Sequence, residues 1–568
     1  MKLSIWKQAP GPVRLHAAVG ASLAALVVSA VFGSGSTTAV AADTPATDAS
    51  PTSSGIILGV GANESQRVVS WYSSVGTVQA VEVAPTSQLV HGQFPANDRV
   101  RQGQCVKGGS TRSSLTSPTP PSWRASSRAR CGAVTFPATV TANSVNAGFN
   151  AHQTIDGLQE NVAYSYRVGA EGSWSPTYAF KTQDFEGDFD FLFFGDPQIG
   201  SSGDVAKDGA GWLDTLNVAL AANPDAELLV SGGDQVDKAN TEPQWDSFLA
   251  PDKLRQYPWA ATIGNHDVGG KAYEQHFWTP NTDRSAPFYK GDAATTSGGD
   301  YWYIYKDVLF IDLNSNAYAN GSDAAHLGYV SDVVQAHGAD AKYTVLAYHH
   351  SIYSPADHAN DTDNQTRRLD FPTAFSKLGV DLVLQGHDHA YSRSYAIKNG
   401  QKAKVGEQPG ADQVAEGPGG VIYVTANSAS GSKYYDLTAP DTTADPNYGP
   451  DPLNPNSHWA NSVENQEHVR TYVKVGVRKN KLVVENVRSG TCAAPNAAVE
   501  VGKVSWCGPN SGASPAQPVG STVDKVAIHP YRGRGALNAP AGPHGSSWTT
   551  NKSQNGEGRA TLTLTALS

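Results

Sequence analysis

The chain has 568 residues, of which 39% are hydrophobic and 17% are charged, a composition typical of globular rather than disordered proteins. This length exceeds that of one ordinary domain, so we expect more than one. The formal net charge of −10 argues against nucleic-acid and membrane partners held by electrostatic attraction. We expect neither kind of partner, and the sequence leaves the oligomeric state open.

Residues 1–41 have the pattern of a bacterial-type secretory signal peptide. Lys2, Lys7 and Arg14 precede an apolar run over 17–32, and small residues follow at 39–41. A retained membrane anchor is the alternative, but the apolar run is short for a span. No twin arginine and no nearby cysteine accompanies the run, which favours general secretion. We therefore expect a secreted protein, extracellular or associated with the cell wall.

Four cysteines remain after this segment: Cys105, Cys131, Cys492 and Cys507. An even number of cysteines in an exported chain predicts two disulfides. Three pairings are possible, and the pairs close in sequence are Cys105–Cys131 and Cys492–Cys507. A thiolate metal site is the alternative, but no CxxC spacing supports it.

The first half of the chain begins with a flexible leader over 42–53, rich in Thr, Ser, Pro and Ala. Residues 54–183 then show short strand patterns, such as 67–72, 77–83 and 163–168, separated by turns. Helical periodicity is scarce in this region, so the pattern predicts an all-β sandwich.

Residues 184–531 change to an alternation of strand, loop and helix, which predicts an α/β domain. A helix is expected over 212–221, and 428–467 is a long excursion that could form part of a pocket rim. Residues 532–568 read as a C-terminal tail rich in Gly, Asn and Ser. The expected strands of the α/β domain are 189–194, 227–230, 259–263, 301–313, 344–347, 382–384, 472–477, 481–487 and 523–528.

Five of these strands are followed at once by side chains that bind metals. The segments are Gly195-Asp196-Pro197-Gln198, Gly233-Asp234-Gln235-Val236-Asp237, Gly264-Asn265-His266-Asp267, Tyr348-His349-His350 and Gly386-His387-Asp388-His389. A lone Asp after a strand is usually a turn or a helix cap, and a lone His is usually structural. That ordinary interpretation suffices for Asp267, Asp388 and Arg393. Five such segments in succession instead predict one pocket for two cations.

Each candidate ligand has a distinct part in such a pocket. Asp234 is the candidate bridge between two metals, Asp196 holds the first metal, and Asn265 offers the second a neutral oxygen. His387 and His389 are two residues apart, so each can serve a different metal. A histidine of the 349–350 pair completes the second metal, and spacing alone hardly separates His349 from His350.

The ligand set also predicts the metals and the reaction. Oxygen and nitrogen ligands without sulfur favour iron, manganese or zinc. Two such ions make hydroxide available near neutral pH and bind the oxygens of a tetrahedral anion, which predicts in-line hydrolysis of a phosphate ester. His266 follows the Asn ligand and is expected to contact the phosphate or to protonate the leaving group. His350 and His358 are further candidates for phosphate contact.

These residues resemble the calcineurin-like metallophosphoesterases, and most closely their purple acid phosphatase branch. Residues 386–393 are similar to its GHxHxYxR signature, and 61–66 followed by 68–72 resemble its fibronectin-III-like N-terminal domain. His349 stands four before Tyr353, like the metal-binding histidine of the branch, and His358 falls close to its substrate-contacting histidine. The resemblance covers roughly residues 55–528.

The resemblance implies an αββα two-sheet sandwich and two sets of metal ligands. It implies Asp196, Asp234 and His389 on one metal. It implies Asp234, Asn265, His349 and His387 on the other.

Two positions depart from the family pattern. The purple branch has a tyrosine ligand three residues after the bridging Asp, where this chain has Asp237. The wider superfamily often has Asp-x-His in the first motif, where this chain has Asp196-Pro197-Gln198. Gln198, Asp237 or water must therefore complete the first metal. Without a tyrosinate ligand, we expect no purple charge-transfer colour.

The leading hypothesis is a secreted phosphatase that hydrolyses small phosphate monoesters, as acid phosphatases do, with hydroxide activated by two metals. A phosphodiesterase or nucleotidase on the same site is the nearest alternative, since ligand residues do not distinguish leaving groups. An alternative of another class is a non-catalytic protein that binds the cell wall or glycans and carries a degenerate site.

Overall fold

The computed structural model describes residues 52–95, 133–286, 289, 296–318, 321–490 and 517–531. All of them fall within one compact unit, Ser50–Ser568. The predicted signal peptide, nearly all of the leader, the four cysteines and the tail over 532–568 lie outside the described residues, and the predictions made for them stay predictions. Among the described residues, no helix combines the length and the apolar character needed to cross a membrane.

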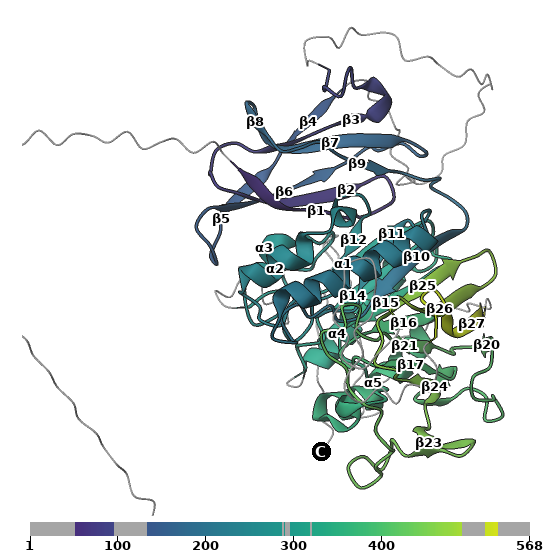
Figure 1. Ribbon diagram of the computed structural model, residues 1–568. Helices are drawn as coiled ribbons and strands as arrows, with labels where there is room; N and C mark the ends of the chain where they lie inside the picture. The colour runs from purple at the N-terminus through teal and green to yellow at the C-terminus, as the bar shows by residue number, and fades with distance from the viewer. Residues whose placement is uncertain are drawn as a thin grey trace, which may run out of the picture. The chain divides into compact units, whose positions relative to one another are not determined.

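The strands described before residue 182 form an all-β sandwich, which confirms that prediction (Figure 1). Tyr164, Tyr166 and Val168 alternate along one strand and point into its core, where Trp71 is also buried. One sheet holds β1 (Ser53–Val60), β2 (Arg67–Ser73), β6 (Phe149–Ile155) and β5 (Thr139–Ala142). The other holds β4 (Val134–Pro137), β3 (Ala80–Pro85), β7 (Ala163–Ala170), β8 (Ser173–Trp174) and β9 (Tyr178–Lys181), and a 3₁₀ turn, Thr86–Gln88, follows β3.

Two further groups of strands build the α/β domain. The first group runs in the order β20 (Gln413–Gly417), β27 (Thr522–Pro530), β26 (Leu482–Arg488), β25 (Thr471–Val477), β10 (Phe189–Phe194), β11 (Leu228–Ser231) and β12 (Trp259–Ala260). The second runs in the order β13 (Tyr301–Tyr305), β14 (Val308–Leu313), β15 (Tyr343–Tyr348), β16 (Leu382–Gln385), β21 (Ile422–Thr425), β17 (Tyr391–Ser394) and β24 (Asn461–Asn465). Small two-stranded sheets join β18 (Ile397–Lys398) to β19 (Gln401–Lys402) and β22 (Pro450–Asp451) to β23 (Asn454–His458).

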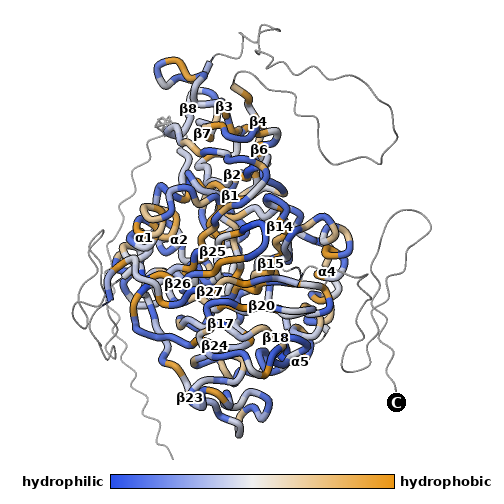
Figure 2. Tube along the Cα trace, turned by 90° about the vertical axis from the view of Figure 1, so that its right-hand side faces the viewer, coloured by the Kyte–Doolittle hydropathy of each residue, from blue (hydrophilic) through white to orange (hydrophobic). Residues whose placement is uncertain are grey.

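The two large sheets pack face to face, and helices cover their outer faces. Phe191 and Val475 of the first sheet share a core with Val345 and Leu384 of the second. The first sheet is covered by α1 (Val205–Ala222), α2 (Glu242–Leu249) and α3 (Ala272–His276), and the second by α4 (Ser322–His337) and α5 (Thr362–Leu378). Short 3₁₀ turns lie at Asp252–Arg255 and Asp357–Asn360. The central strands β25 and β15 are among the most hydrophobic parts of the trace (Figure 2). The predicted αββα sandwich is confirmed.

Some boundaries differ from the predictions. Helix α1 begins well before the predicted 212–221, because the Asp204 side chain caps it by accepting a hydrogen bond from the Lys207 N–H at 3.0 Å. The helix contains Gly211 at a position that has no room for a side chain, because a Cβ there would stand 2.0 Å from the carbonyl oxygen of Ser430. The predicted strand 259–263 is regular only over Trp259–Ala260. The predicted excursion 428–467 carries β24, whose pairing with β17 the sequence did not indicate.

The first sheet continues from β12 of the α/β domain to β1 of the N-terminal sandwich. β12 pairs in parallel with β1 through Trp259 and Gly59, so one hydrogen-bonded sheet spans both regions. Arg255 lies at this junction, where its guanidinium donates to the carbonyl oxygen of Ile56 at 3.4 Å and lies over the ring of Tyr178 at 5.5 Å. The sandwich and the α/β domain therefore share backbone hydrogen bonds as well as side-chain contacts.

Candidate metal centre

The predicted ligand segments leave the strands at one edge of each large sheet. β10, β11 and β12 are parallel neighbours in the first sheet, and β15 and β16 are parallel neighbours in the second. Because the carboxyl ends of parallel strands meet at the same edge, the five following loops converge. The candidate ligands come from both sheets and meet where these loops face one another.

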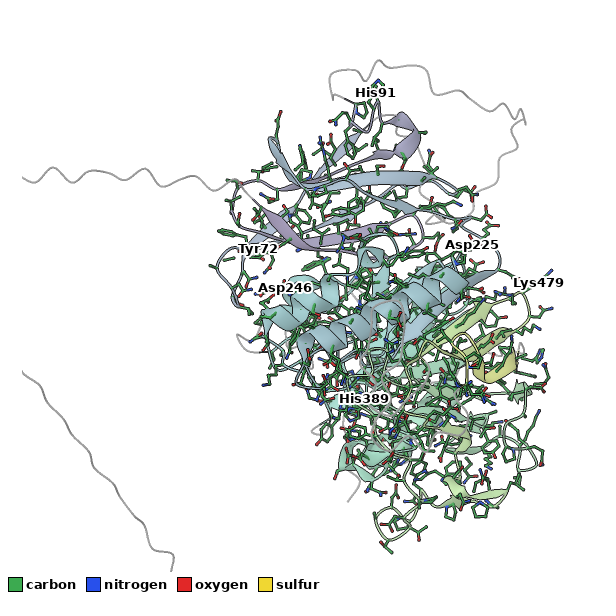
Figure 3. All side chains as sticks on the ribbon, viewed as in Figure 1. Tyr72, His91, Asp225, Asp246, His389 and Lys479 are labelled. Carbon is green, nitrogen blue, oxygen red and sulfur yellow. The ribbon has the colours of Figure 1, made fainter. Side chains whose placement is uncertain are left out.

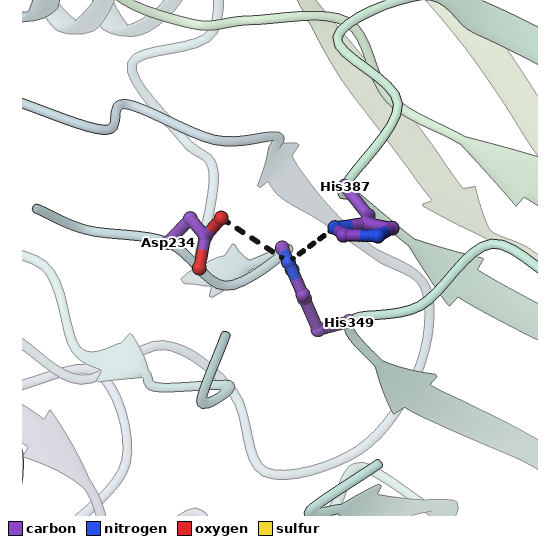
Figure 4. Close-up of side chains that lie close together, drawn as sticks. All are labelled: Asp234, His349 and His387. Atoms are coloured by element: carbon purple, nitrogen blue, oxygen red, sulfur yellow. Dashed lines mark hydrogen bonds and ion pairs between the residues drawn. The ribbon is translucent and has the colours of Figure 1, made fainter. Parts of the chain in front are cut away.

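His349 stands at the centre of the first group of contacts. Its Nε2 atom lies 2.9 Å from Oδ1 of Asn265, 3.2 Å from Oδ2 of Asp234 and 3.1 Å from Nδ1 of His387. Figure 4 shows Asp234 and His387 on either side of this imidazole. Donor atoms of Asp234, His349 and His387 lie within 4.8 Å of one another, as metal ligands do. The structure thus brings together the four residues predicted for the second metal.

The orientation of His349 follows from its other nitrogen. Nδ1 lies 2.7 Å from the carbonyl oxygen of Gly232, which can only accept, so Nδ1 carries the proton. Nε2 consequently faces the carboxylate and amide oxygens. Burial lowers the pKa of His349, but the charges of Asp234 and Asp196 raise it to about 10. Burial conversely raises the pKa of Asp234, and His349 lowers it to about 2. A positive charge is therefore favoured at this point of the site.

Asp196 and Gln198 form the second group with Asp237. Asp196 is fully buried, and neither of its carboxylate oxygens has a hydrogen-bond partner among the described residues. Its Oδ1 lies 3.5 Å from Nδ1 of His349. Gln198 donates from Nε2 to Oδ1 of Asp237 at 3.2 Å, which leaves its buried Oε1 without a partner among those residues. Burial, together with the charge of Asp234, raises the pKa of Asp196 well above its usual value.

His389 follows β16 and is almost completely buried (Figure 3). Its Nδ1 lies 3.1 Å from the carbonyl oxygen of Lys433, so this nitrogen donates and Nε2 keeps its lone pair. Burial, followed by the charge of Lys433, lowers the pKa of His389 to about 3. The imidazole is therefore neutral, the form that binds metals.

The chemistry of these donors fits a cation. Burying a carboxylate without hydrogen bonds costs several kcal/mol, roughly, unless a positive charge compensates it. Asp196 is such a carboxylate, and the buried amide oxygen of Gln198 is likewise without a hydrogen-bond partner among the described residues. Asp196, Asp234, His387 and His389 also adopt positive φ angles of 21°, 47°, 74° and 45°. Such strain in non-glycine residues concentrates at functional sites.

Two glycines allow the ligand loops to approach one another. A Cβ at Gly264 would lie 1.9 Å from Oδ1 of Asp234, and a Cβ at Gly233 would lie 2.4 Å from Nδ1 of His349. Both distances are far below contact distance. Gly233 also has a φ of 96°, which side chains disfavour. These positions must stay without a side chain for the carboxylate and the imidazole to meet.

The predicted catalytic histidines take different positions. Nδ1 of His266 lies 2.7 Å from the carbonyl oxygen of Asp237, and its half-buried side chain is 31% exposed. The ring of His358 stacks on that of His387 at 3.7 Å, and its Nδ1 lies 2.7 Å from Oδ2 of Asp361. Both His266 and His358 thus stand at the accessible side of the metal ligands.

His350 lies deeper, behind the ring of His387. Its Nδ1 lies 2.8 Å from Oγ of Ser315, and its Nε2 lies 3.9 Å from Asp363. Burial, helped by the charge of Arg367, lowers its pKa well below the usual value. The structure therefore directs His349, and not His350, towards Asp234 and Asn265.

Several contributors were missed by sequence reasoning. Asp267, given an ordinary role, accepts hydrogen bonds from the N–H groups of Gly264 at 2.9 Å and Gln235 at 3.1 Å, and so joins two ligand loops. Its spacing after Asn265 is that of an ordinary turn, so the sequence carried little signal. Asp361, three residues after His358, was a local signal that could have been found. Lys433 carried no signal, because only the fold brings it to His389.

Comparisons with known proteins agree with the fold. The calcineurin-like phosphoesterase model matches residues 189–391, and the purple acid phosphatase N-terminal domain matches residues 53–182. The phosphoenolpyruvate phosphatase of Allium cepa is 23% identical over 270 residues, covering 44% of this chain and 52% of that protein. Purple acid phosphatase 22 of Arabidopsis thaliana is 24% identical over 259 residues, covering 44% of this chain and 54% of that protein.

The chain thus spans about half the length of these curated relatives. Among solved structures, the purple acid phosphatase from seeds of Lupinus luteus aligns with a TM-score of 0.54 at 15% identity, covering 84% of this chain and 74% of that one. At this identity the likeness concerns the fold alone. Residues 189–391 thus form a calcineurin-like phosphoesterase domain, and residues 53–182 form a purple acid phosphatase N-terminal domain.

Proposed function

We propose that this protein hydrolyses small phosphate monoesters at a pair of metal ions drawn from iron, manganese and zinc. The family implies a dinuclear metal centre. The observation that carries the proposal is the convergence on His349 Nε2 of Asn265 and Asp234 oxygens at 2.9 and 3.2 Å. The buried carboxylate of Asp196, which has no hydrogen-bond partner among the described residues, lies next to the same imidazole. The signal-peptide pattern of residues 1–41 supports the further proposal that the protein acts after export.

Each metal would have its own ligands and share one carboxylate. Asp196, Gln198, Asp234 and His389 would hold the first metal. Asp234, Asn265, His349 and His387 would hold the second. When bound, two such cations supply Lewis acidity towards the phosphate oxygens and towards a water molecule.

The chain's own hydrogen bonds prepare these ligands. The carbonyl oxygens of Gly232 and Lys433 accept hydrogen bonds from Nδ1 of His349 and of His389, respectively. These bonds direct both Nε2 atoms into the site. Asp237 orients the amide of Gln198, because its carboxylate accepts from Nε2 and so turns Oε1 away. We assign Asp237 to this orienting role rather than to direct metal contact.

Proton transfer and phosphate contact fall to the accessible histidines. Asp361 holds Nδ1 of His358 at 2.7 Å and favours the protonated imidazole, whose Nε2 can donate a proton to the departing oxygen. His266, held by the carbonyl oxygen of Asp237, is placed to donate to a phosphate oxygen. Ser315 holds His350, so we place this residue behind His387 as a support instead of against the phosphate.

The substitution Asp234→Asn tests this function. It removes the shared negative charge, so we expect turnover of 4-nitrophenyl phosphate to fall by about 10³-fold or more, or ~4 kcal/mol in the barrier. Metal content measured by elemental analysis should fall in parallel. Chelation should inactivate the unmodified protein, and added metal should restore it.

Asp246→Asn is the matched control, because Asp246 is an exposed carboxylate on α2 (Figure 3). It should keep full turnover and metal content. Bis(4-nitrophenyl) phosphate, assayed in parallel, should react much more slowly than the monoester. Unchanged turnover in Asp234→Asn would remove this residue from the mechanism, and a metal-free active protein would end the proposal.

A further inference from the structure

The segment 427–436, which follows β21, forms a wall of the metal centre that is fastened to the first ligand loop. Oγ of Ser428 donates to the carbonyl oxygen of Asp196 at 3.1 Å, and Oγ of Ser432 donates to that of Pro197 at 3.1 Å. Ser430 also donates to Pro197. These contacts link positions more than 200 residues apart in the chain. The wall is therefore held along the Asp196 loop.

The same wall is fastened to the other ligand loop. Nε2 of Gln466 donates to the carbonyl oxygen of His389 at 2.7 Å and to that of Tyr435 at 2.6 Å. The carbonyl oxygen of Lys433 accepts from the His389 ring. The wall thus presents Lys433 and Tyr435 in a fixed position beside the metal ligands.

The side chains of Lys433 and Tyr435 lie against each other at the rim. Nζ of Lys433 stands 4.3 Å from the centre of the Tyr435 ring. The Tyr435 ring meets His358 edge-on at 5.3 Å and His389 at 5.5 Å between ring centres. The Lys433 ammonium and the two imidazoles thus contact the same aromatic ring. Both side chains are partly exposed, so a ligand can reach them.

Among the described residues, no carboxylate lies within 4.0 Å of the Lys433 ammonium. The neighbouring Asp436 is instead paired with His468 at 2.6 Å. Asp357 and Asp388 act on the neighbouring Tyr435 ring without pairing with Lys433. A cation on a fixed wall, with no carboxylate of the described residues at ion-pair distance, favours an anion from outside.

We propose that Lys433 and Tyr435 form a subsite for the leaving group, selecting phosphate monoesters whose leaving group carries a second anion, a carboxylate or another phosphate. This proposal rests on the proposed function, because it takes the bound phosphate ester to be a substrate. Binding of a second anion by Lys433 can nevertheless be measured without turnover. The ammonium pairs with the second anion, and the Tyr435 ring packs against the atoms between the two anions.

Binding of stable phosphonates to the metal-loaded protein tests the subsite. The probes are phenylphosphonate, 4-carboxyphenylphosphonate and 1,4-phenylenediphosphonate, measured by calorimetry. In Lys433→Gln, the affinity for the two doubly anionic probes should fall about tenfold, equivalent to about 1.4 kcal/mol. The affinity for phenylphosphonate should change less than about twofold. Lys433→Arg should keep most of the selectivity, and 0.5 M salt should reduce it.

Lys398→Gln is the matched control, because Lys398 is an exposed lysine on β18, which contributes nothing to the centre. Loss on only one of the two doubly anionic probes would identify the anion that the subsite takes. Equal loss on all three probes, or no loss on any, would overturn the proposal. Selective binding without turnover of any ester by the unmodified protein would support the subsite and reject the proposed hydrolysis.

Discussion

Asp237 lies at the position where the purple acid phosphatases have a tyrosine ligand. Its carboxylate accepts from Nε2 of Gln198 at 3.2 Å, which leaves the buried amide oxygen of Gln198 without a hydrogen-bond partner among the described residues. A neutral oxygen stabilises a trivalent ion less than an anionic phenolate does. Under the proposed function, the first metal position would accept divalent as well as trivalent ions.

Asp237→Tyr tests the origin of this difference. The unmodified protein loaded with iron should show no phenolate-to-iron band in the visible spectrum. The tyrosine variant should gain such a band, because its phenolate can reach the iron that Gln198 faces. Asp237→Phe, which adds the ring without the oxygen, should stay colourless. A purple unmodified protein would contradict the assignment of Gln198 and Asp237.

At the scale of elements, the loop after β12 joins the two sheets. Nδ2 of Asn316, which follows β14, donates to the carbonyl oxygens of Ile263 and Gly264, each at 3.2 Å. Oδ2 of Asp267 accepts from the Gly264 N–H at 2.9 Å. The path of the loop past Asp234 is thus fixed from both sides, which leaves little freedom for adjustment.

Gly264→Ala should disrupt this contact. The added Cβ would lie 1.9 Å from Oδ1 of Asp234 and 2.3 Å from its backbone nitrogen, so loop and carboxylate must separate. We expect about 10²-fold lower turnover, reduced metal content, and a loss of roughly 1–3 kcal/mol of stability from overpacking. Circular dichroism should retain the native secondary structure.

Gly269→Ala, in the same loop, is the control for this effect. A Cβ at Gly269 would meet no atom within 4 Å, so turnover should stay within about twofold of the unmodified protein. Equal turnover of the two variants would show that the approach of the loop to Asp234 is unimportant.

At the scale of the whole molecule, the sandwich and the catalytic domain share a sheet. The parallel pairing of β12 with β1 and the contacts of Arg255 with Ile56 and Tyr178 cross between them. The hydroxyl of Tyr166, in the sandwich core, also donates to the carbonyl oxygen of Arg255 at 2.9 Å. Unfolding of one part would therefore expose hydrogen-bonding and apolar groups of the other.

We expect one cooperative unfolding transition for both parts. Calorimetry, tryptophan fluorescence and far-ultraviolet circular dichroism should report the same Tm. Arg255→Ala should lower that Tm by about 1–3 °C, since it removes the junction contacts. Lys398→Gln should leave it unchanged. Two separated transitions, with the sandwich unfolding first, would show that the shared sheet does not couple the two parts.

Much of the fold and the candidate ligands could be predicted from local patterns. Strands such as 189–194 and 382–384 were recognised because alternation and apolar runs are properties of neighbouring residues. Asp196, Asp234, Asn265, His387 and His389 were singled out because each follows such a strand, and parallel strands bring their ends together. The family resemblance depends on the same short segments, so it was equally accessible.

Only the tertiary structure decided which atoms of these residues face the centre. The Gly232 carbonyl, 117 residues away in sequence, turns Nε2 of His349 towards the centre, and Lys433 reaches the rim through a loop held to Pro197, 235 residues from Ser432. The junction of β12 with β1 depends on an equally remote contact. Local sequence specifies a residue's backbone and the chemistry of its side chain, whereas hydrogen bonds between distant segments determine where that side chain points.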